Sequence, residues 1–134
     1  MSTLLLSSLL WMAVAADNAD AASPAVVEVK DAQPSQSIFD AASRKEPLEL
    51  KSRQEAEKHF SEDALAKLAK QVDFEKQVVL VFAWKGSGQD RLDVEVLESF
   101  PEQVVFRYKR GLTRDLRPHV HVYALRSNVK WSVK

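Results

Sequence analysis

The apolar residues of this chain recur with two different periods, and the change falls near residue 72. Before it, Leu65, Leu68 and Val72 are spaced so that they share one face of a helix. After it, Val78–Trp84 is a run of β-branched, aromatic and other apolar residues, which is typical of a strand covered on both faces. The pattern therefore predicts a helical segment followed by a sheet.

Two serines mark the predicted beginnings of helices. Ser52 is followed three residues later by Glu55, the spacing of a capping box, in which the serine oxygen accepts from a backbone amide and the glutamate returns the bond. Ser61 precedes two acidic residues, which stabilise the positive end of a helix. We expect two short helices, or one helix broken near Ser61, over residues 53–71.

Alternation of apolar and polar residues predicts further strands. Phe106 and Tyr108 alternate with Arg107 and Lys109, so we expect the rings to face inward and the cations outward. The fold class is α+β: short helical segments, then a mostly antiparallel sheet of five or six strands in meander order, curled toward a barrel or a sandwich. The predicted strands are 48–50, 77–84, 92–97, 104–109, 119–125 and 129–133.

Two irregularities are expected between these strands. Residues 86–90, Gly-Ser-Gly-Gln-Asp, read as a hairpin-like loop in which each glycine permits a positive φ. Leu97 breaks the alternation of its strand, which predicts a bulge or a twist there.

The beginning of the chain has the composition of a leader. Residues 4–15 are apolar apart from two serines, and Ala13-Val14-Ala15 offers a cleavage site with small residues at its first and third positions. The run is shorter than the roughly 20 residues of a membrane span. We predict a signal peptide at 1–15, with a buried N-terminal helix as the alternative, and no span in the mature chain. The protein is then exported, either periplasmic or secreted.

The remaining residues divide into a linker and one domain. Residues 16–37 lack a sustained period and predict a flexible linker, within which 25–29 has the pattern of a brief edge strand. Residues 38–134 are expected to form a single α+β domain. The chain has no cysteine, which excludes disulfides, thiol catalysis and thiolate metal sites.

Three consecutive features carry a family resemblance: Val72-Asp73-Phe74, the apolar strand Val78–Phe82 and the glycine loop after it. Over residues 72–126 the chain resembles the C-terminal domain of PrcB-like proteins, which are associated with protease complexes of bacterial envelopes. The family usually has a Thr-Gly-Gly-Tyr-like turn, where this chain has Gly86-Ser87-Gly88-Gln89-Asp90. The resemblance implies a non-catalytic module that associates with or stabilises another envelope protein.

Charge is divided unevenly along a chain whose formal net charge is zero. Residues 101–134 hold eight Lys and Arg against two acidic residues. Loops held by a rigid sheet are the usual place for recognition, so the loops 85–90 and 110–117 are the predicted binding segments. The candidate binding residues are Lys85, Ser87, Gln89, Asp90, Arg110, Arg114 and Arg117.

Two other kinds of site are left open by the sequence. His119 and His121 share one side of a strand, where both could approach a metal if Asp115 or His59 completed the site. The alternative is that both rings pack on a half-exposed strand face with Tyr123. The basic C-terminal region could bind a polyanion, or could be a solvated face that pairs with the acidic helices.

These patterns together predict an exported, non-enzymatic protein-interaction module of the bacterial envelope. Its expected partner is another envelope or secreted protein, for which a protease is one candidate. We expect no cofactor and no nucleic-acid partner. The alternatives are a metal-binding protein or small metal-dependent enzyme centred on His119 and His121, and a polyanion-binding module.

Overall fold

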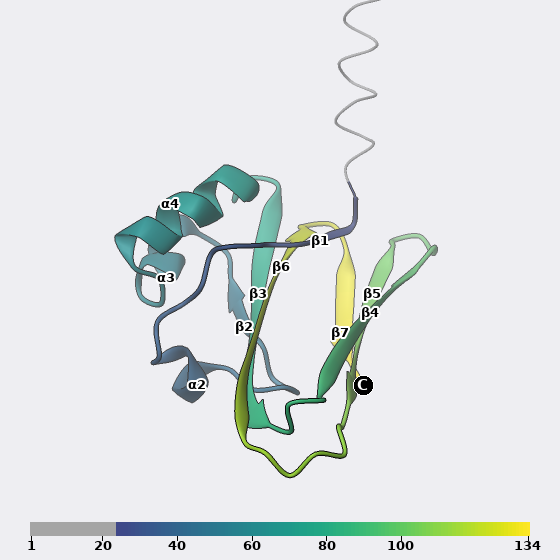
Figure 1. Cartoon of the computed structure of the whole chain (residues 1–134). Helices are drawn as coiled ribbons and strands as arrows, with labels where there is room; N and C mark the ends of the chain where they lie inside the picture. The colour runs from purple at the N-terminus through teal and green to yellow at the C-terminus, as the bar shows by residue number, and fades with distance from the viewer. Residues whose placement is uncertain (1–23) are drawn as a thin grey trace, which may run out of the picture.

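The computed structural model describes residues 24–134, in which three short helices lie on one side of a β-sheet and a second sheet lies on the other (Figure 1). This arrangement confirms the predicted α+β class. The elements in chain order are β1 (Val26–Glu28), α2 (Ile38–Ala41), β2 (Leu48–Leu50), α3 (Arg53–Glu57), α4 (Glu62–Gln71), β3 (Gln77–Gly86), β4 (Arg91–Leu97), β5 (Gln103–Lys109), β6 (Arg117–Arg126) and β7 (Lys130–Val133).

The strands form two separate sheets rather than one meander. The first sheet has the order β1-β6-β3-β2 and the second β4-β5-β7, and the strands of residues 24–134 form no closed barrel. All pairings are antiparallel except that of β5 with β7. The predicted meander order is wrong because the chain leaves the first sheet after β3 and returns to it only at β6. The central ladder, β3 with β6, runs from Gln77 opposite Arg126 to Gly86 opposite Arg117.

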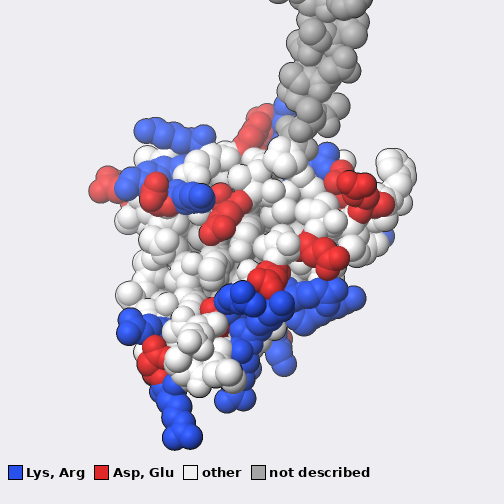
Figure 2. All heavy atoms as spheres, turned by 45° about the vertical axis from the view of Figure 1, so that its right-hand side comes forward, with Lys and Arg blue, Asp and Glu red and all other residues white. Residues whose placement is uncertain are grey.

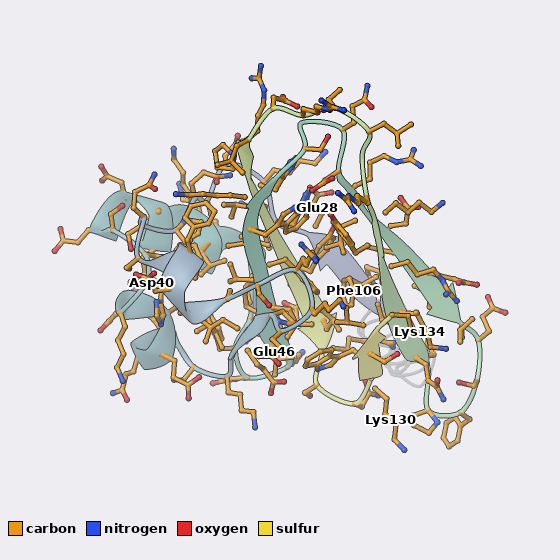
Figure 3. All side chains as sticks on the ribbon, turned by 90° about the horizontal axis from the view of Figure 1, so that it is seen from below. Glu28, Asp40, Glu46, Phe106, Lys130 and Lys134 are labelled. Atoms are coloured by element: carbon orange, nitrogen blue, oxygen red, sulfur yellow. The ribbon has the colours of Figure 1, made fainter. Side chains whose placement is uncertain are left out.

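Strand β3 is buried on both faces, as its apolar run predicts. Its odd-numbered residues, such as Val79 and Val81, belong to a core beneath the helices. Its even-numbered residues, such as Phe82 and Trp84, belong to a second core between the two sheets. Phe106 of β5 lies in that second core (Figure 3), with its ring centroid 4.8 Å from that of Phe82. The expected inward position of the β5 rings is confirmed.

The helical region is broken where the sequence predicts it. The Ser52 hydroxyl accepts from the Glu55 amide at 3.2 Å, and the Glu55 carboxylate accepts from the Lys51 amide at 2.8 Å. The returning bond therefore reaches one residue further back than a capping box requires. The Ser61 hydroxyl accepts from the Ala64 amide at 3.3 Å and begins α4.

Part of the predicted linker packs against the domain. Strand β1 pairs with β6 at the edge of the first sheet, which confirms the brief edge strand. Ala25, Val29 and Ala32 are buried, and the Gln71 side chain donates to the Lys30 carbonyl oxygen at 2.6 Å. The predicted signal peptide, 1–15, and the first part of the linker, 16–23, lie outside the described residues.

Strand β4 is the long outer edge of the second sheet. Its pairing with β5 continues without interruption to Leu97 opposite Gln103, so the predicted bulge is absent. Leu97 simply ends the strand. No helix within residues 24–134 is both long enough and apolar enough to cross a membrane.

Candidate functional site

Two loops meet at one end of the molecule, at the lower end in Figure 1. The loop between β3 and β4, residues 87–90, and the loop between β5 and β6, residues 110–116, each carry the chain between the two sheets. The first is therefore no hairpin, because β3 and β4 belong to different sheets. Between the loops lies a cleft of about 820 Å³, lined by Arg44, Gly86, Ser87, Asp90, Tyr108, Arg110, Gly111, Leu112, Thr113, Arg114, Asp115 and Leu116.

Hydrogen bonds join the two loops directly. The Gly111 amide donates to Asp90 Oδ1 at 2.7 Å, and the Gly88 amide donates to Asp115 Oδ1 at 3.1 Å. The hydroxyls of Ser87 and Thr113 share a further bond. Because these contacts connect residues far apart in the sequence, they hold the cleft in one shape.

Asp90 is the buried charged residue at the base of this arrangement, with 7% of its surface exposed. Its Oδ2 accepts from the Trp84 indole and from the Tyr108 hydroxyl, both at 3.0 Å, and its Oδ1 accepts from Gly111. Burial raises the pKa of Asp90, but these three donors stabilise the carboxylate and the net pKa lies below its ordinary value. Asp90 is thus a buried residue that holds neighbouring segments together by hydrogen bonds, and not the exposed binding residue that the sequence predicts.

The chain's three glycines all lie at this site, and their role differs from the predicted one. None of the three has a positive φ. A Cβ on Gly111 would lie 2.6 Å from the Gln89 carbonyl carbon, and one on Gly88 would lie 2.5 Å from Asp115 Oδ2. A Cβ on Gly86 would meet Asp90 Oδ2. Glycine is required here because neighbouring atoms approach the backbone closely.

Three arginines line the cleft without an ion pair to any residue of 24–134: Arg44, Arg110 and Arg114. The Arg44 guanidinium lies 4.7 Å from the centroid of the Tyr108 ring. Sequence reasoning missed Arg44, because it comes from the segment between α2 and β2 and nothing in its local pattern places it beside the loops. Arg117 differs from these three, since its Nε donates to Asp115 Oδ2 at 2.7 Å.

Positive charge dominates this end of the molecule (Figure 2). The Asp115 carboxylate accepts from the Thr113 hydroxyl, the Gly88 amide and Arg117, which together hold its pKa well below its ordinary value. Both carboxylates of the cleft therefore have donors within the protein.

Leu112 and Leu116, in the loop between β5 and β6, are 93% and 75% exposed.

The remaining predicted binding residues flank the cleft. Gln89 lies in the first loop, where its backbone amide donates to the Ser87 hydroxyl at 3.2 Å. Lys85 lies near the end of β3, and its Nζ is 5.3 Å from the centroid of the Phe39 ring. Residues 24–134 contain no ion pair between Lys85 and Asp90.

The two predicted histidines pack against Trp84. The rings of His119 and His121 have centroids 4.9 Å and 5.5 Å from that of Trp84, and His121 also stacks on Tyr123. This confirms that both share one strand face. Burial lowers the pKa of His121, His119 adds to this effect and Glu28 opposes it. Residues 24–134 hold no group of three or more His, Cys, Asp or Glu arranged for a metal.

The outer face of the second sheet accounts for two of the cations of the basic region. Arg107 bonds to Glu95 at 3.3 Å and Lys109 to Asp93 at 3.0 Å, all with exposed side chains. Their outward position is confirmed, but their partners lie on β4 and not on the helices. The cations are therefore paired across neighbouring strands, as sheet geometry favours.

Neither a family model, nor a curated protein, nor a solved structure matches this chain. Several polar groups of the two loops bond to one another. The Ser87 hydroxyl faces Thr113 and the Gln89 amide, while the His119 Nε2 faces the Ser87 carbonyl oxygen at 2.7 Å. A serine and a histidine placed in this way do not form the hydroxyl-to-imidazole contact of a nucleophile and its base.

Proposed function

We propose that the protein is an exported, non-enzymatic module that binds another envelope or secreted protein through this cleft. The observation that carries the proposal is a cleft whose two loops are bonded to each other while three arginines and two leucines on it are free for contact. A site that is already ordered loses little conformational freedom on binding.

Two features of the sequence support the same proposal. The apolar run before Ala13-Val14-Ala15 supports export. The resemblance of residues 72–126 to PrcB-like domains supports association with an envelope protein, for which a protease is a candidate. The Ser87 hydroxyl bonds to Thr113 and to the Gln89 backbone amide, while the His119 ring bonds to the Ser87 carbonyl oxygen, and this arrangement favours recognition over catalysis.

Site-specific photocrosslinking in cells tests the proposal. The full chain would carry benzoylphenylalanine at Leu112, on the cleft, or at Phe100, which is equally exposed but lies in the turn between β4 and β5. We expect one dominant crosslinked protein from position 112 and none from position 100. The same crosslinks from both positions, or none from position 112, would contradict the proposal, as would recovery of the chain only in the cytoplasm.

A further inference from the structure

We infer that the cleft takes an acidic peptide segment, whose carboxylates bind Arg44, Arg110 and Arg114 and whose apolar side chains cover Leu112 and Leu116. The inference rests on the function proposed above, because it names the chemistry of the partner at the same site. Three properties of the cleft support it: the unpaired charge of its arginines, their placement around one cleft, and its exposed apolar side chains.

The arginines of the cleft have no acidic partner among residues 24–134. The two carboxylates that line the cleft, Asp90 and Asp115, are each bonded to donors within the protein. Arg44, Arg110 and Arg114 have no carboxylate of residues 24–134 at ion-pair distance. Negative charges that neutralise these arginines would therefore come from a bound ligand.

The placement of three arginines on one cleft favours a ligand with more than one carboxylate. The Arg44 guanidinium carbon lies over the Tyr108 ring, 4.7 Å from its centroid, and Arg44 has no ion pair with any residue of 24–134. A planar guanidinium can donate two parallel hydrogen bonds to one carboxylate. Arg110 and Arg114 come from the loop between β5 and β6, and Arg44 from the segment between α2 and β2, so two separate segments place cations on one cleft.

The exposed leucines of the cleft favour a peptide over other anionic ligands. Leu112 and Leu116 are among the most exposed large apolar residues of 24–134, and both lie on the cleft. A sugar or phosphate polymer would leave them uncovered, whereas a peptide with Leu, Ile or Phe beside Asp or Glu would cover them. Moreover, Arg107 and Lys109, which would extend a basic track for a polymer, are paired with Glu95 and Asp93.

Selection from a displayed library of random dodecapeptides tests this inference on the mature chain, residues 16–134. We expect enrichment of peptides in which Asp or Glu adjoins a large apolar residue. In titrations with an enriched peptide, Arg110→Gln and Arg114→Gln should each weaken binding about tenfold, the usual effect of losing one charge-assisted hydrogen bond. Arg53→Gln on α3 is the matched control, since it removes an exposed arginine far from the loops and should leave affinity unchanged.

The other outcomes overturn the inference in distinguishable ways. Enriched peptides that are neutral or basic, and that lose binding with Leu112→Ser, would overturn the acidic ligand while leaving the cleft as the recognition site. Arg114-dependent binding to heparin or to phosphatidylglycerol vesicles, with no peptide enriched, would replace the peptide by a polyanion or a membrane. Acidic peptides that bind Arg110→Gln and Arg114→Gln as tightly as the parent would show that they bind elsewhere. Crosslinking at position 112 decides the proposed function independently of all three.

Discussion

The two ends of the second sheet differ in how their connections are held. At the cleft end, the loops 87–90 and 110–116 are bonded to each other and to the buried carboxylate of Asp90. At the other end, the turn between β4 and β5 has local bonds around Ser99, whose hydroxyl donates to the Pro101 carbonyl oxygen at 2.7 Å, and Phe100 is fully exposed. Both ends connect strands and the second end holds the ion pair of Glu102 with Arg126, but within residues 24–134 the buried carboxylate lies at the cleft end.

This difference indicates that the buried Asp90 carboxylate holds the cleft end of the molecule together. A buried carboxylate is costly unless donors surround it, and Asp90 has donors from β3, β5 and the second loop. Removing any one of these segments would take one of the three donors from the buried carboxylate. Asp90 therefore couples the position of both loops to the packing of the second core, whereas the turn around Phe100 is joined to β6 through the part-buried ion pair of Glu102 with Arg126.

The largest expected effect comes from Trp84, which supplies both packing and a donor. Trp84 is 5% exposed and its indole donates to Asp90. Trp84→Ala should lower the free energy of unfolding by about 3–5 kcal/mol, measured by urea denaturation of the protein. A variant with the stability of the parent would contradict the assignment of Trp84 to the second core.

Asp90→Ala should have the next largest effect, about 2–3 kcal/mol, because three donors lose a charged acceptor. Asp90→Asn is the matched control, since it keeps the shape and one carbonyl oxygen, and it should cost less. Equal stability of Asp90→Ala and the parent in the same urea titration would show that the carboxylate contributes nothing to the cleft end.

The effect of Asp90 should also depend on pH. Its pKa in the folded protein lies below its ordinary value, so it stabilises the fold above the unfolded pKa of about 3.9 and loses this contribution as pH falls through the folded value. The stability difference between the parent and Asp90→Asn should be constant near neutral pH and shrink as the solution is acidified below about pH 4. A difference that grows on acidification would have the opposite sign and would contradict a lowered pKa.

Gly111→Ala should destabilise the fold by about 1–3 kcal/mol, because its Cβ would overlap the backbone and side chain of Gln89. Thermal unfolding measures the loss, and amide NMR spectra should locate the changes in both loops. Spectral changes restricted to residue 111 and its neighbours would mean that the loops are not held together.

Phe100→Ser should have the smallest effect, within about 0.5 kcal/mol, as expected for an exposed residue. It should leave the amide spectrum of the cleft unchanged. A loss as large as that of Gly111→Ala would remove the contrast between the two ends of the sheet.

Local patterns in the sequence were sufficient for most of the elements, although not for helix α2, and for the position of the loops. The apolar run of β3, the serine caps at 52 and 61 and the alternation in β5 each depend on neighbouring residues, and each was predicted. The pairing of β3 with β6 was not, because it joins segments with two other strands between them. Strand alternation does not specify which sheet a strand enters.

The chemistry of the site was predicted only in part for the same reason. Ser87, Arg110 and Arg114 were placed on loops by local signals, and they do line the cleft. The burial of Asp90 depends on Trp84, Tyr108 and Gly111, and the presence of Arg44 depends on a segment before the helices. Glycine was expected for its backbone angles, but what it provides here is space for atoms from other segments.

Hydrogen exchange of the Gly111 amide tests the coupling of the loops most directly. This amide donates to Asp90 at 2.7 Å, although it lies outside every strand. We predict that it is protected in the parent and exchanges at least about tenfold faster in Asp90→Ala, the loss of roughly 1.4 kcal/mol of protection, while amides in the centre of the β3–β6 ladder keep more protection than Gly111. A Gly111 amide that exchanges as fast as an unstructured one in the parent, or at the same rate in both proteins, would contradict the claim that Asp90 holds the cleft together.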